Sequence, residues 1–275
     1  MMRAMNRVST LLFTLVMVAA RVSLIAQPPC DVYLNDPSMT PCVRPNPWDF
    51  NPTPITIRVP LPPNYDTCDI EVHFVRRKYV DTCTGEEMWE YRILFWVYLD
   101  CPAYQAYADS LRDAAPERYR QIVRQLHGEL SRRLIELKFI EDYSNLPPAQ
   151  QLLFHCTEPP PSCAKTKPGG HYISAFVSTC VEFVEVRSFG PTAPLNGCWY
   201  CFISPCTVSK CCFLHQVYCW DTATNSPRMC SWWTFSGNTV ECGGESDFNP
   251  QQAMPDCPPP YMIIWRSGCR AYECP

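Results

Sequence analysis

Glycine is scarce in this chain, and the short motifs that mark common enzyme classes are missing. Only 10 of the 275 residues are glycine, against 29 prolines, so the chain is stiffened in its loops and is not a flexible low-complexity polymer. It has no Walker loop, no Gly-x-Gly-x-x-Gly, no Gly-x-Ser-x-Gly and no His-Glu-x-x-His. The enzyme class stays open but leans towards no, because catalytic groups can also converge from unlinked positions. We expect no cofactor.

Positive charge and long apolar runs are also scarce after residue 26. The 23 Lys and Arg residues include three in the first 26 positions, which leaves 20 against 27 Asp and Glu. A surface that binds phosphates needs clustered positive charge, so nucleic acid is a poor partner. No later segment is long and apolar enough to cross a bilayer, so we expect no membrane span.

Residues 1–26 have the pattern of an export signal peptide. Arg3 and Arg7 precede an apolar run, and Ala26 offers a small residue for cleavage, with Ala20 as the alternative. The pattern predicts a bacterial exported protein that is secreted to the periplasm, the cell surface or the extracellular space. The competing interpretation is an uncleaved, buried N-terminal helix in a cytosolic protein.

All 19 cysteines follow this signal. The densest group is Cys198-x2-Cys201-x4-Cys206-x4-Cys211-Cys212-x2-His215. In a cytosolic protein this spacing would suit zinc, with Cys198, Cys201, Cys211 and His215 as weak candidate ligands. In an exported chain we expect disulfides instead.

An odd number of cysteines leaves at least one thiol without an intrachain partner. One interpretation is an inert buried cysteine. The other is a bond between chains, for which the candidates are Cys83 at a predicted turn tip and Cys30 and Cys274 near the mature termini. The second interpretation makes another copy of the chain a partner.

The remaining pattern predicts an α+β fold: an antiparallel sheet built from two similar hairpins and further strands, one long amphipathic helix packed on it, and a disulfide-dense C-terminal part. Residues 27–66 hold most of the early prolines and predict an extended arm. Residues 67–165 predict a hairpin and the long helix. Residues 166–275 predict a cysteine-rich β part, either separate or joined to residues 67–165 in one domain.

The long helix is expected to begin at Pro116, after a shorter helix over residues 103–113. Apolar side chains recur at spacings of three and four, while charges of both signs fill the other positions as a solvated face. His127 is expected on the helix flank. The apolar stripe consists of Tyr119, Ile122, Val123, Leu126, Leu130, Leu134 and Leu137.

The two predicted hairpins span residues 70–99 and 211–235. Both turns read Asp-Thr-x-Thr followed by glycine or asparagine, which suits a left-handed backbone and indicates a weak internal repeat, although ordinary hairpin chemistry can produce the same pattern. Residues 172–187 predict another strand. We interpret Glu86, Glu87 and Glu90, beside the first turn, as a solvated cluster and not an acid/base pair.

Aromatic side chains crowd the C-terminal part and keep a binding role open. Trp199, Trp232 and Trp233 are the candidate binding aromatics, because flat rings stack on sugars or anchor a protein partner. Rings packed against disulfides are the alternative. The leading expectation is a non-catalytic structural or adhesive protein of the cell envelope or extracellular matrix. A carbohydrate- or protein-binding module that recognises surface glycans or proteins is the runner-up, and a secreted hydrolase is third.

Overall fold

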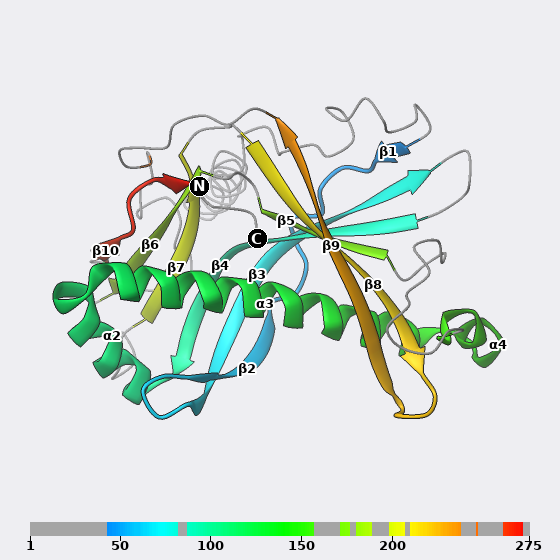
Figure 1. Cartoon of the computed structure of the whole chain (residues 1–275), viewed down its shortest axis with the longest axis horizontal. Helices are drawn as coiled ribbons and strands as arrows, with labels where there is room; N and C mark the ends of the chain where they lie inside the picture. The colour runs from blue at the N-terminus through cyan, green and yellow to red at the C-terminus, as the bar shows by residue number, and fades with distance from the viewer. Residues whose placement is uncertain are drawn as a thin grey trace, which may run out of the picture.

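The computed structural model describes residues 43–81, 87–156, 171–176, 180–188, 198–206, 210–237, 246 and 261–271. This part of the chain is an α+β fold in which helices lie against one hydrogen-bonded sheet (Figure 1). The predicted α+β class is confirmed, and so is the predicted antiparallel sheet, apart from the parallel pair of β4 and β5. The elements are β1 (Val43–Pro45), β2 (Ile55–Leu61), β3 (Asp66–Asp81), β4 (Glu87–Asp100), α2 (Pro102–Ala114), α3 (Pro116–Asn145), α4 (Pro148–Gln151), η1 (Leu152–Phe154), β5 (His171–Phe176), β6 (Cys180–Ser188), β7 (Cys198–Pro205), β8 (Lys210–Asp221), β9 (Ser226–Gly237), β10 (Tyr261–Arg266) and β11 (Arg270–Ala271).

The sheet divides in two along β4. One edge of β4 pairs with β3 throughout, while the other edge pairs first with β5, in parallel, and then with β7, antiparallel. Leu94 is an extra residue in the β3–β4 register, between the pairs made by Ile93 and Phe95. Such a bulge bends the strand and increases its twist. The result is two limbs, β5–β8–β9 and β7–β6–β10, that leave β4 in different directions.

The segment predicted as one strand over residues 172–187 is two strands, which corrects that expectation. β5 pairs with β4 and β8, whereas β6 pairs with β7 and β10. The two strands therefore belong to different limbs. Residues 177–179 between them lie outside the described part. A run of apolar residues cannot by itself reveal such a division, because it does not show which strand each part pairs with.

The described part of the predicted N-terminal arm, from residue 43, lies on the sheet. Both β1 and β2 pair antiparallel with β3, along the edge opposite β4. Alternate residues of β2, namely Ile57, Val59 and Leu61, are buried, so this strand contributes one face to the core. The predicted signal peptide, residues 1–26, lies outside the described residues.

Helix α3 runs across both limbs of the sheet (Figure 1). Its 30 residues span roughly 45 Å at 1.5 Å per residue. Tyr119 near its start contacts Trp265 of β10, and Phe139 near its end contacts Tyr172 of β5 and Tyr218 of β8. One helix thus covers the fork, and the main hydrophobic core lies between the helix and the sheet.

The buried face of α3 differs from the predicted stripe in its last third. Leu137 is 41% exposed, whereas Ile135, Phe139 and Tyr143 are buried. A repeat of seven residues drifts by about 20° per heptad around a straight helix, so over four heptads the apolar stripe moves to the next row of side chains. His127, expected on the flank, is buried.

The turn between β8 and β9 shows why aspartate and asparagine occupy it. The Ala223 N–H donates to Oδ1 of Asp221 at 2.9 Å, which closes the turn locally. Asn225 has a φ of 52°, a left-handed conformation that asparagine tolerates better than most residues. The matching turn after β3, residues 82–86, lies outside the described part of the chain.

Three disulfides join two described cysteines each: Cys68–Cys101, Cys156–Cys219 and Cys206–Cys269. Cys101 immediately precedes α2, and Cys156 follows η1 at the other end of the helical segment. The first disulfide ties the start of this segment to β3, and the second ties its end to β8. The helical layer is therefore bonded covalently to the sheet at both ends.

Candidate functional site

The candidate zinc ligands lie on different limbs of the sheet. Cys201 of β7 pairs with Trp96 of β4, whereas His215 of β8 pairs with Ile173 of β5, which pairs in turn with Glu90 of β4. Glu90 and Trp96 are six residues apart, which is roughly 20 Å along a strand. The sheet therefore separates the thiol of Cys201 from the imidazole of His215.

The two remaining candidate ligands follow the same division. Cys198 begins β7, and Cys211 lies near the start of β8. Cys206 of the same motif is bonded to Cys269. Within the described ranges, no group of three His, Cys, Asp or Glu side chains is placed to hold a metal ion.

Cys201 is an unpaired cysteine, and its thiol is fully buried. Burial raises the pKa of this thiol, and the neighbouring carboxylate of Glu185 raises it further. A thiol with a raised pKa and no contact with solvent is a poor nucleophile. The three candidate interchain thiols, Cys83, Cys30 and Cys274, lie outside the described residues.

Trp199 is enclosed in the core and is only 2% exposed. Its ring stacks on Tyr98, with centroids 3.9 Å apart, and lies 5.6 Å from Tyr104 of α2. The guanidinium groups of Arg112 and Arg187 lie over the indole at 5.2 and 4.9 Å, within the range of a cation–π contact. These neighbours leave the ring almost no exposed surface, so an external ligand does not reach it in this arrangement.

The other two candidate aromatics are placed only by their backbone. Trp232 and Trp233 are consecutive residues of β9, paired with His215 and Leu214 of β8. Consecutive residues of a strand point to opposite faces of the sheet. Their side chains lie outside the part that the structure describes.

A buried carboxylate lies beside Trp199 and Cys201. Glu185 of β6 has no solvent exposure. The Tyr119 hydroxyl donates to its Oε1 at 2.6 Å, and Arg112 Nε donates to its Oε2 at 3.0 Å. Arg112 Nη2 forms an ion pair with the same oxygen at 2.8 Å. Arg112 belongs to α2 and Tyr119 to α3. We call Arg112, Tyr119 and Glu185, with the surrounding rings of Tyr98, Tyr104 and Trp199, the Glu185 cluster.

Burial is the main cause of the electrostatic shifts in the Glu185 cluster. It raises the pKa of the Glu185 carboxyl, although Arg112 and Tyr119 oppose the shift. Burial and the Glu185 charge together raise the pKa of Tyr119. Burial alone would lower the pKa of Arg112, but Glu185, Tyr119 and Asp109 together outweigh it, and the net pKa is raised. The cluster therefore holds an ion pair that joins the α2–α3 corner to β6.

One feature of the sequence indicates the Glu185 cluster: an acidic residue within an apolar strand. Glu185 lies between Val184 and Val186 in a strand whose residues from Val181 to Val186 are all buried. An ionisable side chain in a strand covered on both faces must be paired inside the protein. The partners Arg112 and Tyr119 are more than 60 residues away in sequence, so only the fold identifies them.

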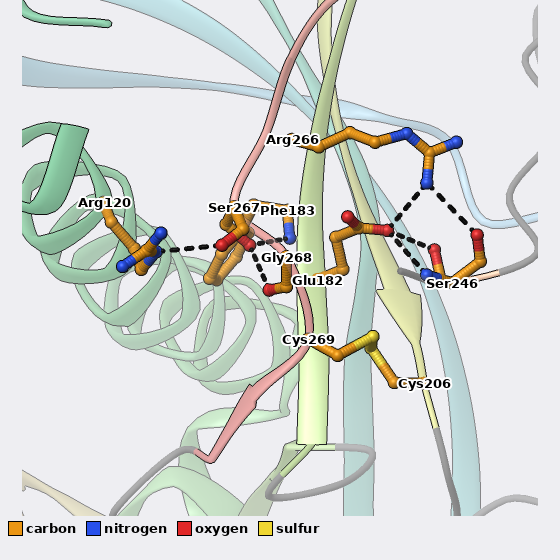
Figure 2. Close-up of a disulfide and its surroundings, with 9 residues drawn as sticks. All are labelled: Arg120, Glu182, Phe183, Cys206, Ser246, Arg266, Ser267, Gly268 and Cys269. Carbon is orange, nitrogen blue, oxygen red and sulfur yellow. Dashed lines mark hydrogen bonds and ion pairs between the residues drawn. A yellow bond between two sulfur atoms is a disulfide. The ribbon is translucent and has the colours of Figure 1, made fainter. Parts of the chain in front are cut away.

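A second buried acid on the same strand holds a distant segment (Figure 2). Glu182 Oε2 accepts from the Ser246 N–H at 3.0 Å, from the Ser246 hydroxyl at 2.5 Å and from Arg266 Nη1 at 3.0 Å. Nearby, the Ser267 hydroxyl accepts from the Phe183 N–H at 2.9 Å. With the Cys206–Cys269 bond, these contacts fix β10 and Ser246 to the β6–β7 limb.

The sheet face opposite α3 holds a third buried ion pair. Arg77 Nε donates to Glu90 Oε2 at 2.6 Å, and the Tyr79 hydroxyl donates to the same oxygen at 2.6 Å. Trp48 lies over the guanidinium of Arg77 at 4.4 Å. The prediction that Glu90 belongs to a solvated cluster is therefore wrong. Glu90 lies directly across from Arg77 in the β3–β4 register, and a register is not visible in a single strand.

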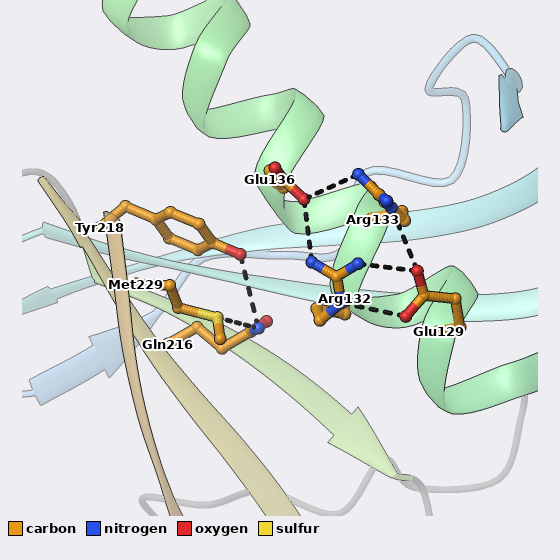
Figure 3. A network of polar contacts seen from close by, with 7 residues as sticks. All are labelled: Glu129, Arg132, Arg133, Glu136, Gln216, Tyr218 and Met229. Carbon is orange, nitrogen blue, oxygen red and sulfur yellow. Dashed lines mark hydrogen bonds and ion pairs between the residues drawn. The ribbon is translucent and has the colours of Figure 1, made fainter. Parts of the chain in front are cut away.

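The outer surface of α3 carries a ladder of exposed and half-buried ion pairs (Figure 3). Arg132 donates to both carboxylate oxygens of Glu129, at 2.7 and 3.0 Å, and to Glu136 at 3.1 Å. The hydrogen bond from Arg132 lowers the pKa of Glu129. Pairs of this kind stabilise a helix by only about 0.3–0.5 kcal/mol each, because water screens them. The positive charges of this face are therefore largely neutralised by neighbours.

Comparison with known proteins does not identify the site, because the chain matches no protein family, no curated protein and no solved structure.

None of the helices in the described ranges combines the length and the apolar character needed to cross a membrane.

Proposed function

We propose that this chain is an exported, disulfide-stabilised and non-catalytic protein that acts as a structural or adhesive component of the cell envelope or extracellular matrix. The observation that carries the proposal is the covalent attachment of the helical layer at both ends, through Cys68–Cys101 and Cys156–Cys219. Disulfides are typical of oxidising compartments outside the cytosol. They also prevent the helices from separating from the sheet when the protein is stretched or locally unfolded.

The use of buried charge supports the same proposal. Glu182, Glu185 and Glu90 are each fully buried and bonded to arginine, tyrosine or serine groups of other elements. Removing one partner of such a pair costs about 3–5 kcal/mol. In the described residues these carboxylates connect distant parts of one chain, and this arrangement suits a rigid building block.

The finer details of the fold are part of the proposal. We regard β3–β4 and β8–β9 as the two similar hairpins of a weak internal repeat, each formed from long antiparallel strands. Cys83 at the tip of the first hairpin corresponds to Ala223 at the tip of the second. We place the bond between chains at Cys83 because of its position at the hairpin tip. Since Cys201 already accounts for the odd number of cysteines, this bond requires a second thiol without an intrachain partner.

The second candidate function is a carbohydrate- or protein-binding module. Trp199 is enclosed by Tyr98 and Tyr104, so this candidate now depends on Trp232 and Trp233 of β9. Loss of glycan binding in Trp232→Ala and Trp233→Ala would support it, whereas an absence of glycan binding by the unaltered protein would remove it.

The proposed function is tested by gel electrophoresis of the exported protein with and without reductant, after alkylation of free thiols. We expect oligomers that collapse on reduction, and we expect Cys83→Ser to abolish them. Cys201→Ser is the matched control, because it removes a buried thiol and should leave the oligomers intact. A monomer with a single alkylated thiol under all conditions would remove the disulfide-linked assembly and favour the binding module.

A further inference from the structure

Strand β9 lies at the outer end of the β5–β8–β9 limb and pairs, among the described residues, only with β8. The β8–β9 register continues over 12 consecutive pairs without a shift. At about 3.3 Å per residue, the outer edge of β9 is roughly 40 Å long. An edge of this length is a template for pairing with another strand, because within the described ranges no second strand takes up its outward N–H and C=O groups.

The proline in β9 indicates which residues face outwards. Proline has no N–H to donate, so within a sheet it occupies positions where the backbone faces away from the neighbouring strand. Pro227 lies opposite Trp220 of β8. Because the register has no shift and backbone direction alternates along a strand, the odd positions share the orientation of Pro227. The outward backbone groups belong to Met229, Ser231, Trp233, Phe235 and Gly237.

The other edges of the sheet carry features that discourage pairing. β10 has six residues and a bulge between Ile263 and Trp265. β2 has seven residues, an exposed Pro60 and an Arg58 whose side chain is 75% exposed. Short length, bulges, proline and exposed charge are the means by which proteins protect sheet edges. After Pro227, β9 carries only one charge, that of Arg228, which lies 3.8 Å from Asp221.

We propose that β9 pairs antiparallel with β9 of a second copy of this chain and thereby forms one continuous sheet across a two-fold axis. A second copy is favoured over an unrelated strand because the central residues, from Met229 to Gly237, are uncharged. A two-fold interface brings each strand against itself, and an uncharged strand meets no like charge in doing so. This inference rests on the proposed assembly function and adds an interface distinct from the interchain thiol.

The two interfaces together define an assembly. A two-fold contact at β9 joins copies in pairs, and a disulfide at Cys83, on a different hairpin, would join each pair to the next. Two different two-fold contacts on one subunit link copies beyond a dimer, into a closed tetramer or ring when the two axes intersect and into an open chain when they do not. The β9 contact alone produces a dimer.

The inference is tested on the full, oxidised chain by light scattering over a dilution series, with Ser231→Pro and Ser231→Ala compared. Ser231 is exposed, so both variants lose the same side-chain contacts, but only the proline removes an outward N–H and leaves the bonds to β8 in place. With Cys83 present, we expect the wild type and Ser231→Ala to exceed the mass of a dimer and Ser231→Pro to stop at a disulfide-linked dimer. After Cys83→Ser is added to each protein, we expect twice the monomer mass for the first two and monomer mass for Ser231→Pro. Equal masses for the two variants would overturn the inference, and so would a wild type that is monomeric throughout.

Amide hydrogen exchange of the wild type provides an independent test if Ser231→Pro does not fold. The amides of Met229, Trp233 and Phe235 should gain protection as concentration rises, while those of Cys230 and Thr234, which face β8, should be protected at every concentration. Odd-numbered amides that exchange at one rate across the series would overturn the β9 interface.

Non-reducing SDS gels of the same samples separate the two proposals. A native dimer that dissociates in SDS without reductant supports the β9 interface and contradicts the interchain thiol. Oligomers that dissociate in SDS only when reductant is added, combined with equal native masses for Ser231→Pro and Ser231→Ala, would support the interchain thiol and overturn the β9 interface.

Discussion

His127 should make the protein less stable as the pH falls, and the size of the effect can be calculated. Its imidazole is 5% exposed on the inner face of α3, where it packs against the rings of Trp96 and Phe183. Burial lowers its pKa from 6.5 to about 3. In the unfolded chain the imidazole gains a proton near its ordinary pKa, while in the folded protein it stays neutral. The folded state is therefore favoured by this group above pH 6.5, and that stability is lost as the pH falls towards 3.

On acidification from pH 7.5 to pH 4.5, the imidazole of the unfolded chain is protonated below its pKa of 6.5, while that of the folded protein stays neutral. The two states therefore differ in bound protons over about two pH units. At 1.36 kcal/mol per unit, the free energy of unfolding should fall by about 2.7 kcal/mol through His127 alone. For a chain of this length that corresponds to a decrease in Tm of roughly 5–10 °C. Other groups also titrate, so the contribution of His127 is the difference between wild type and a variant without a titratable group at this position.

The assay is urea unfolding at the two pH values for the wild type, His127→Gln and His127→Leu, with disulfides intact. We expect both variants to lose about 2.7 kcal/mol less than the wild type on acidification, although their absolute stabilities should differ because glutamine and leucine pack differently. Agreement between the two variants separates titration from packing. If all three proteins lose the same stability between pH 7.5 and 4.5, the reasoning about His127 is wrong.

Three further predictions follow from the buried ion pair and the cysteines. Arg112→Gln should lower the free energy of unfolding in urea by about 3–5 kcal/mol, because Glu185 loses its charged partner. Adding Glu185→Gln to this variant should restore part of the loss, and losses that simply add in the double variant would contradict the pairing. Replacing Cys156 and Cys219 by serine should lower stability by about 4 kcal/mol, the value for a closed loop of 63 residues, and unchanged unfolding would show that the bond restrains little. Cys201 should react with a thiol reagent only after unfolding, and mass spectrometry of alkylated native protein that finds it modified would contradict its burial.

Local patterns were sufficient where neighbouring residues determine the structure. Pro116 begins α3 as expected, because proline lacks only an N–H that the first helical turn leaves free. Asp221 and Asn225 form the turn between β8 and β9 through contacts within the turn itself. Side-chain spacing located the apolar face of the first half of α3, since Tyr119, Val123 and Leu126 are buried there.

Patterns failed where the outcome depends on which strands become neighbours. Glu90 looks like a solvated acid next to other acids, but its partner Arg77 lies across the strand pair. Trp199 looks like a candidate platform for a ligand, but α2 brings Tyr104 against it. In each case the partner comes from a separate element, and only strand register or helix packing selects it.

The sequence by itself determined the α+β pattern, the use of disulfides in place of most free thiols, and an excess of acidic over basic residues. These follow from composition and short-range periodicity, which do not depend on how the chain closes on itself. Only the tertiary structure decided the division of the sheet at β4, the path of α3 across both limbs and the separation of Cys201 from His215. Those features are set by long-range pairing. Either edge of β4 can form backbone hydrogen bonds with another strand, and only the whole fold determines which strand that is.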